Sequence, residues 1–485
     1  MKKFINKIKN NKVLSILSVL IIGLFFILVT RITYAYLAPV INDAQTNVVG
    51  STDTVDDFKF ELGDPLKIDA TPTTLKENGT NYVTSTTAKA LLKANSTKNT
   101  ATYNYYVYFQ ILSNTFTYSD GSTPEIILTV TNPNGEEVTS IEGLTYGTFN
   151  GVSGFDITTK KGLFNIANSY EITSNSSTTY TTQSWTIKIT YLNLSIDQSA
   201  NFGNSMGVNV YITKKEKVLL TNYVISQYTG AQGTNNIYYH NSSLANGAGD
   251  NSYRYAGANP NNFVCFGSDA SPCPDANLFR IIGVFGDKTK VIRAKSTGNQ
   301  KWHTSNTNTW STSSLNTYLN GEYLTSLGTL KNKIATTTWK VGGGSWSNIG
   351  TSVPKTAYQY EVGSSASSTT YDAKIGLMYV SDYYYSASPS AWTLIGFVAN
   401  NSAKDYRAAT SINWLHLDSG EWTISRRSDY SEGAFLVSHI GVGGGVVRNG
   451  VVSNLSYAVR PSFNLLSSTT YVSGSGSMSD PVRIN

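Results

Sequence analysis

The chain has 485 residues, enough for two or three domains with sizeable hydrophobic cores. Only 14% of the residues are charged and 32 are tyrosine, a composition typical of extended β proteins rather than of helical or disordered chains. Six basic residues and no acidic residue lie in positions 1–35, and these six account for the whole excess of 37 basic over 31 acidic residues. The remainder is neutral, so its charge gives no support for nucleic-acid binding.

Residues 1–35 have the pattern of an export segment. Five lysines precede an apolar run over residues 13–29, and the small residues that end at Ala35 suit cleavage by a signal peptidase. Cleavage after Ala35 is the favoured interpretation. The alternative is an uncleaved transmembrane helix that anchors the chain, because 17 apolar residues are at the short limit for crossing a membrane. Both interpretations predict that residues 36–485 are secreted or lie on the extracellular face of the cell membrane.

Residues 36–214 are predicted to form a β-sandwich. Alternation of apolar and polar residues predicts strands over 103–112, 125–131, 184–194 and 207–213, with turn-rich spacers between them. One helix is expected to interrupt them over residues 87–94.

The stretch YLNLSIDQSANFGNSMGVNVYIT at 191–213, together with an export segment that ends in YAY, resembles the camelysin and TasA-type matrix proteins of Gram-positive bacteria. The resemblance covers about 180 residues and implies a jelly-roll sandwich. It also implies a route to self-association, in which residues 36–50 are donated as a strand to the open sheet edge of a neighbouring molecule. A simple spacer domain is the alternative.

Residues 215–274 are predicted to be a linker helix and a disulfide loop that lead into the second domain. The helix is indicated by Leu220, Val224 and Tyr228 at four-residue spacing. Cys265 and Cys273 are the only cysteines, and a close pair in an exported chain predicts a disulfide. A metal site would need two more ligands, and none is legible nearby, so no metal is expected.

Residues 275–485 are predicted to form a second, α+β domain. A hairpin is expected over 279–285 and 288–293, followed by a helix over 310–321 that begins at a serine cap and stops at Gly321. A core strand follows over 375–381. Two further buried strands, over 422–425 and 457–465, flank about thirty polar residues, and an irregular connection of that length is usually functional or disordered.

This order of elements resembles a widespread bacterial surface domain that belongs with the C-type-lectin-like and formylglycine-generating-enzyme folds. The matching residues are Trp422, Ser425, Arg426 and Ser428 before the loop, and Ala458, Val459, Arg460 and Pro461 after it. The resemblance covers most of residues 275–485. It implies a small twisted sheet with long ordered loops on one side, and it implies that these loops hold the ligand.

The predicted ligand-binding residues are polar or aromatic side chains in and near this loop: Trp414, His416, Arg426, Arg427, Asp429, Tyr430, Glu432, His439, Arg448 and Asn449. Tyrosine and arginine make contact surfaces at low entropic cost. The alternative for Trp414 is a position in the hydrophobic core, and the alternative for His416 and His439 is that they are ordinary polar surface groups. A structural role is expected for Trp310, Trp422, Arg460 and Pro461, with the guanidinium of Arg460 inside the domain and bonded to loop carbonyls.

No catalytic motif is present: the chain has no G-x-S-x-G, no H-E-x-x-H and no phosphate-binding loop. Asp418 and Glu421 would be the carboxylate pair of a glycoside hydrolase, but no cleft is legible around them. The calcium-lectin signature is also missing. We therefore expect no enzyme activity, no cofactor and no metal, while sugar binding through aromatic stacking remains open.

The sequence thus predicts an exported Gram-positive cell-surface protein for adhesion, in which a β-sandwich spacer presents a C-type-lectin-like domain with a variable loop to an unknown protein or glycan ligand. The alternative is a structural matrix or fibre subunit that assembles through the β-sandwich. A glycan-active enzyme ranks third.

Overall fold

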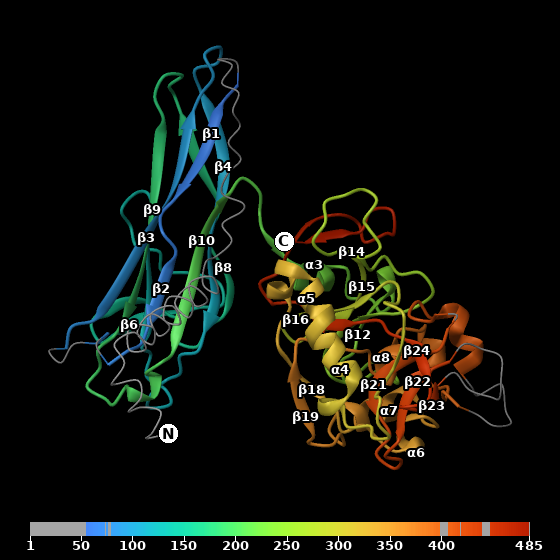
Figure 1. Cartoon of the computed structure of the whole chain (residues 1–485). Coiled ribbons are helices and arrows are strands. Elements are labelled where there is room, and N and C mark those ends of the chain that lie inside the picture. The colour runs from blue at the N-terminus through green and yellow to red at the C-terminus, as the bar shows by residue number, and fades with distance from the viewer. Residues whose placement is uncertain are drawn as a thin grey trace, which may run out of the picture.

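The structure, a computed structural model, describes residues 55–72, 74–75, 79–397, 406–417, 419–438 and 447–484, without the side chains of Ala408 and Arg448. The described chain is mainly β-structure in several sheets, as the sequence predicts. It forms two bodies, and Figure 1 shows them joined by the chain that follows β10. The core of the first body runs from Phe58 to Ile212 and that of the second from Leu220 to Val482.

The first body consists of two antiparallel sheets that share one core. The six-stranded sheet has the order β1-β3-β9-β5-β7-β6 and the four-stranded sheet the order β2-β10-β4-β8. The strands are β1 (Asp57–Leu62), β2 (Leu66–Asp69), β3 (Tyr82–Lys93), β4 (Ala101–Asn114), β5 (Ile126–Thr131), β6 (Thr145–Phe149), β7 (Val152–Asp156), β8 (Gly162–Ser174), β9 (Thr181–Tyr191) and β10 (Ser205–Thr213).

Each of the four strands predicted for this body is present, as β4, β5, β9 and β10. The helix predicted over 87–94 is wrong, because these residues belong to β3. In β3 every second residue from Thr86 to Leu92 is buried, and the residues between them are partly exposed. This two-residue alternation places small and aliphatic side chains in the sandwich core, and it overrides the helix preference of alanine, leucine and lysine.

The second body is built on a ten-stranded and a five-stranded sheet. The main path of the larger sheet is β11-β26-β27-β14-β15-β16-β25-β20, with β12 and β13 attached to it, and the smaller sheet has the order β17-β24-β21-β22-β23. The strands of the larger sheet are β11 (Val218–Leu219), β12 (Ile237–Tyr239), β13 (Tyr253–Tyr255), β14 (Phe263–Cys265), β15 (Leu278–Phe285), β16 (Lys288–Arg293), β20 (Ile375–Gly376), β25 (Ser462–Asn464), β26 (Thr470–Ser473) and β27 (Val482–Ile484).

The smaller sheet contains β17 (Asn299–Lys301), β21 (Glu421–Arg426), β22 (Gly433–Val437), β23 (Val447–Val451) and β24 (Ser456–Ala458), and β18 (Thr337–Lys340) pairs with β19 (Thr370–Ala373) as a separate ribbon. The hairpin predicted across residues 286–287 is present as β15 and β16. The strand predicted over 457–465 is two strands, because the chain leaves the smaller sheet after β24 and joins the larger sheet as β25.

The helices of the second body lie in short pieces: α3 (Leu220–Ser226), η2 (Thr234–Asn236), η3 (Trp310–Thr312), α4 (Ser314–Tyr318), η4 (Leu319–Tyr323), α5 (Leu324–Ser326), η5 (Gly328–Lys333), α6 (Trp346–Ile349), α7 (Pro354–Glu361), α8 (Val380–Tyr385), η6 (Pro389–Ala391) and η8 (Tyr406–Ile412). The predicted serine cap is confirmed, since Ser313 Oγ accepts the backbone N–H of Asn316 at 3.0 Å. The predicted stop at Gly321 is wrong, because the chain continues through it as a π-helical turn into α5.

The predicted core strand over 375–381 is also wrong in its second half. Only β20 is extended, and α8 begins at Val380. Two buried carboxylates favour the helix start: Glu361 accepts the N–H groups of Val380 and Ser381 at 3.0 and 2.7 Å, and Asp382 accepts that of Tyr379 at 2.8 Å. Carboxylates at this position complement the unpaired N–H groups and the dipole of a helix N-terminus.

Residues 215–274 are part of the second body rather than a separate linker. The predicted helix is α3, and its side chains Leu220 and Val224 enter the same core as Ile237, Tyr255 and Val264. Tyr228 lies two residues beyond the end of α3.

The export segment, the cleavage position Ala35 and the strand-donating residues 36–50 lie outside the described residues. Within the described residues, no helix combines the length and the apolar character needed to cross a membrane.

Candidate functional site

The predicted thirty-residue irregular loop is shorter than the sequence suggests. Two strands, β22 and β23, lie inside it and form an antiparallel meander with β21. All five residues of β22 are buried, so this strand shows an unbroken apolar run instead of the alternation that would reveal it. The exposed connection that remains between β21 and β22 spans residues 427–432, which we call the contact loop.

A single buried side chain holds the backbone of the contact loop. The amide nitrogen of Asn308, which is 1% exposed, donates to the carbonyls of Arg427, Tyr430 and Gly433 at 2.7, 3.0 and 2.7 Å. Its backbone N–H donates to Ser431 O at 2.8 Å. Asn308 lies more than 115 residues before the loop, and nothing in its local sequence indicates this role.

A glycine run fixes the start of the contact loop from the other side. Gly344 accepts the N–H of Ser428 at 2.9 Å, and Gly342 O accepts Arg426 Nε at 3.0 Å. Gly343 has a φ of +63°, and a Cβ added to it would lie 1.9 Å from the carbonyl oxygen of Arg426. Only glycine fits this close approach of two backbones.

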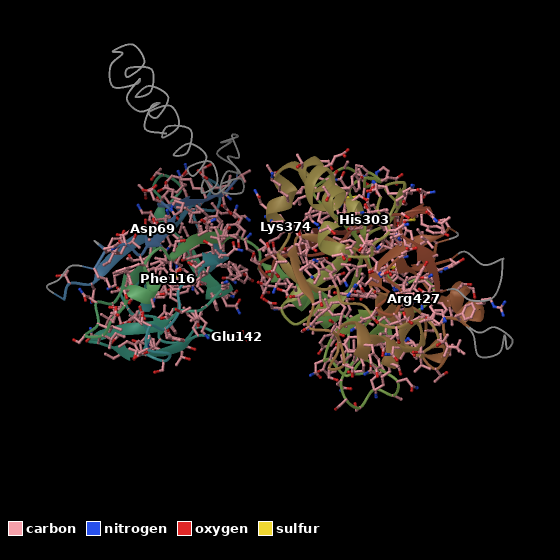
Figure 2. All side chains as sticks on the ribbon, turned by 60° about the horizontal axis from the view of Figure 1, so that its bottom comes forward. Asp69, Phe116, Glu142, His303, Lys374 and Arg427 are labelled. Carbon is pink, nitrogen blue, oxygen red and sulfur yellow. A yellow bond between two sulfur atoms is a disulfide. The ribbon has the colours of Figure 1, made fainter. Side chains whose placement is uncertain are left out.

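The outward surface of the contact loop combines an ion pair with aromatic rings. Arg427 donates Nε and Nη2 to Asp429 at 2.9 and 3.0 Å, and its guanidinium lies 5.6 Å from the ring centre of Trp346 and 5.5 Å from that of Tyr430. Tyr430 is 37% exposed and donates its hydroxyl to Glu432 at 3.3 Å. In Figure 2, Arg427 lies in the half of the second body that is farther from the first body.

Trp346 of α6 joins this surface from outside the contact loop. Its backbone N–H donates to Asp429 at 3.1 Å, and its ring stacks on Phe435 of β22 with an interplanar angle of 6°. The hydrogen bonds from Arg427 lower the pKa of Asp429, so the pair stays charged near neutral pH. Such a surface can form cation–π, stacking and charge-assisted contacts with a partner.

The other predicted residues near the contact loop lie as follows. Arg426 is half-buried and donates to Gly342 O and to Asn308 Oδ1, so its guanidinium serves the loop support. Asn449 on β23 lies beneath Gly433, and its Oδ1 is buried with no hydrogen-bond partner among the described residues. His439 and the side chain of Arg448 lie outside the described residues.

Trp414 and His416 are separate from the contact loop. Trp414 is 5% exposed, donates Nε1 to Tyr255 O at 2.9 Å and lies against the guanidinium of Arg280. A ring so enclosed offers no open stacking face, which corrects the expectation that it contributes to ligand contact. His416 is half-buried, with Nδ1 3.0 Å from the hydroxyl of Tyr383.

Arg460 lies inside the second body, in the segment that crosses between the two sheets. It is 2% exposed and donates Nε and Nη2 to Glu421 at 2.7 and 2.6 Å, and Nη2 also to Leu415 O at 2.6 Å. The sequence predicted the internal position and a carbonyl partner but not the buried carboxylate. Trp310, Trp422 and Pro461 are buried beside the same sheets, as structural residues would be.

A second group of buried charges lies between β13, β16 and α8. Lys290 Nζ is 2.5 Å and Arg254 Nη1 3.9 Å from Asp382, and Arg254 Nη2 is 2.6 Å from Asp250. The two cations and two carboxylates balance, and the side chains of Arg254, Lys290 and Asp382 are at most 6% exposed. The Asp250 side chain, at the edge of the group, is 18% exposed. Balanced pairs with so little exposure indicate a structural network.

The predicted disulfide between Cys265 and Cys273 is present. Within the described residues no group of three or more His, Cys, Asp or Glu side chains is arranged to hold a metal ion. Of the carboxylate pair considered for glycoside hydrolysis, Asp418 lies outside the described residues and Glu421 is bound to Arg460. Comparison of the chain with protein-family models, with curated proteins and with solved structures gave no match.

Proposed function

We propose that this protein is an exported cell-surface recognition protein, in which the first body is a spacer of the jelly-roll type and the second, a C-type-lectin-like domain, contacts its ligand through the contact loop and Trp346. The observation that carries the proposal is a surface of exposed Asp429 and Tyr430 with half-buried Arg427 and Trp346, on a backbone held by Asn308 and the glycine run. A protein or a glycan is the proposed ligand, and no catalytic step is part of the proposal.

Two features favour recognition at this surface. Aromatic and arginine side chains supply most of the binding energy in protein interfaces, and they do so best when their backbone is already ordered. The Arg427 guanidinium is paired with Asp429 and flanked by two rings, so little conformational freedom would be lost on binding. The surface is therefore preorganised without being buried.

The test uses the exported chain, residues 36–485, on printed arrays of glycans and proteins. Arg427→Ala and Tyr430→Ala should each weaken binding to the selected ligand about tenfold or more, as central interface residues do. Both side chains are at the surface, so the midpoint of thermal unfolding should move by no more than a few degrees. Full binding by both variants would contradict the proposal.

Matched controls are available on the same chain. Tyr82 on β3 is 38% exposed, close to the 37% of Tyr430, and Tyr82→Ala should leave binding unchanged. Lys295 forms an exposed ion pair with Asp275 at 2.6 Å, and Lys295→Ala controls for loss of a surface cation. Equal loss of binding in these controls would show that the effect is not specific to the contact loop.

An alternative function as a fibre subunit has one structural observation in its favour. β2 pairs with β10 over Ser205–Val208, the first four residues of that nine-residue strand, so β2 covers only part of this edge. An edge of this kind accepts a donated strand. Fibres formed by residues 36–485 but not by residues 51–485, seen by electron microscopy, would favour this alternative; two monomeric proteins would exclude it.

A further inference from the structure

We propose that the second body has a separate binding site for a neutral saccharide, in a hollow at the C-terminal end of α3. The hollow has a volume of about 170 Å³ and is lined by Gln227, Asn235, Asn236, Tyr255, Asn261 and Ser475. This volume corresponds to several water molecules at ~30 Å³ each, enough to admit part of a sugar ring. Figure 1 places α3 and α6, which carries Trp346, at opposite ends of the second body, so the proposal does not depend on the contact loop.

The chemistry of the lining is polar and uncharged. Four carboxamides and two hydroxyls offer both donors and acceptors, as a polyhydroxylated ligand requires. No Lys, Arg, Asp or Glu is among the lining residues, so nothing there would favour a charged ligand. The side chains of Asn236 and Asn261 make no hydrogen bond to other described residues, and both residues are exposed.

Tyr255 is the buried residue of the lining. The residue is only 2% exposed and lines the hollow, and its hydroxyl makes no hydrogen bond to another described residue. A ligand hydroxyl in the hollow could supply the hydrogen-bond partner that this hydroxyl lacks within the protein. Burial raises the pKa of Tyr255, so the hydroxyl keeps its proton and can donate as well as accept.

The walls of the hollow are fixed by the backbone. Asn235 and Asn236 both have a φ of +57°, a left-handed conformation that asparagine tolerates. Asn235 Nδ2 donates to Gln227 O at 2.9 Å, and Asn236 O accepts the N–H of Ala256 at 2.9 Å. These contacts hold η2 against α3 and β13, so the backbone that carries Asn235 and Asn236 is positioned before a ligand arrives.

A cluster of tyrosines extends from the hollow along β12 and β13. Tyr239 and Tyr253 are paired across the two strands and stack at 4.5 Å, and Tyr228 packs against both rings. Tyr253 and Tyr255 lie two residues apart on β13, so their side chains point to the same face. All three tyrosines of the cluster are half-buried. Aromatic faces beside amide and hydroxyl groups match the apolar face and the hydroxyl edge of a sugar.

The experiment measures saturation transfer by NMR from residues 36–485 to glucose, galactose, mannose and N-acetylglucosamine, with sialic acid as an anionic comparison. We expect transfer to at least one neutral sugar and none to sialic acid. Tyr255→Phe removes one hydroxyl and should weaken binding of that sugar about three- to tenfold, the equivalent of one hydrogen bond. Asn236→Ala, at an exposed position, should have a similar effect.

The matched control is Tyr323→Phe, because Tyr323 is also buried in the second body with an unpartnered hydroxyl but does not line the hollow. This variant should bind as the unchanged protein does. The proposal is overturned by absence of transfer to every neutral sugar, by stronger transfer to sialic acid, or by binding that Tyr255→Phe and Asn236→Ala leave intact. Loss of sugar binding in Arg427→Ala alone would move the sugar to the contact loop, which overturns this site and leaves the proposed function standing.

Discussion

Replacing Arg460 with methionine tests whether the crossing between the two sheets depends on its buried ion pair. The substitution removes three hydrogen bonds of 2.6–2.7 Å and leaves the carboxylate of Glu421, 1% exposed, without its cation. Breaking one side of a buried pair costs about 3–5 kcal/mol, a large share of the 5–15 kcal/mol that stabilises a typical domain. We therefore expect Arg460→Met to lower the free energy of unfolding of the second body by about that amount.

A double-mutant cycle separates the pair from the packing around it. Glu421→Leu alone should cost a similar amount, because it leaves the guanidinium buried and unpaired. The double variant Arg460→Met with Glu421→Leu removes both charges, and its free energy of unfolding should lie within about 1–2 kcal/mol of that of the unchanged protein. The remaining cost arises because Leu415 O loses its hydrogen-bond donor. The expected coupling energy is thus several kcal/mol.

Urea unfolding followed by tryptophan fluorescence is a suitable assay, since only Trp185 of the eight tryptophans belongs to the first body. Burial raises the pKa of Glu421, and loss of Arg460 should raise it further. A raised folded-state pKa makes the variant lose stability as the pH rises above about 4.5, where the unfolded carboxyl ionises. A cost of Arg460→Met below about 1 kcal/mol at pH 7, or strictly additive single variants, would refute the reasoning.

Two further predictions concern a buried histidine and the glycine run. Burial lowers the pKa of His240 well below 6.5, so as the pH falls the unfolded chain takes up a proton before the folded chain does. The free energy of unfolding should therefore be highest above about pH 6.5 and fall by up to about 1.4 kcal/mol per pH unit below it. His240→Asn should flatten this slope between pH 5 and 6.5 in unfolding titrations. Gly343→Ala should destabilise the second body by about 1–3 kcal/mol, because the Cβ of the alanine would clash with the carbonyl oxygen of Arg426. The same variant should bind ligand more weakly in the array assay. An unchanged midpoint of thermal unfolding would show that the backbone can move aside.

The strands that could be predicted are those with one buried face. β9, for example, buries Trp185, Ile187 and Ile189 and leaves Thr186 and Lys188 at least partly exposed, and such alternation is visible in the sequence. β22 is buried on both faces and so shows no period. The helix predicted at residues 87–94 was wrong because the local residues favour a helix, whereas the sandwich requires an extended chain there.

The partners of individual side chains were harder to predict than the elements. The internal position of Arg460 follows from a charged residue before a proline in an apolar segment, but its partner Glu421 lies 39 residues away on another strand. Asn308 is 119–125 residues from the three carbonyls it binds. Contacts of this kind depend on how sheets are joined, and a single sequence contains no local pattern for them.

The meander of β21, β22 and β23 changes what the contact loop can tolerate. Since the strands that flank it are buried and its backbone is held by Asn308 and Gly344, the side chains of Arg427, Tyr430 and Glu432 can change with little effect on folding. The supporting residues Asn308 and Gly344 cannot be replaced in this way, because each contacts backbone atoms of the contact loop directly. The contact loop thus combines side chains that can be replaced with a backbone support that tolerates little change. Stability measurements on variants of these two groups should therefore separate them.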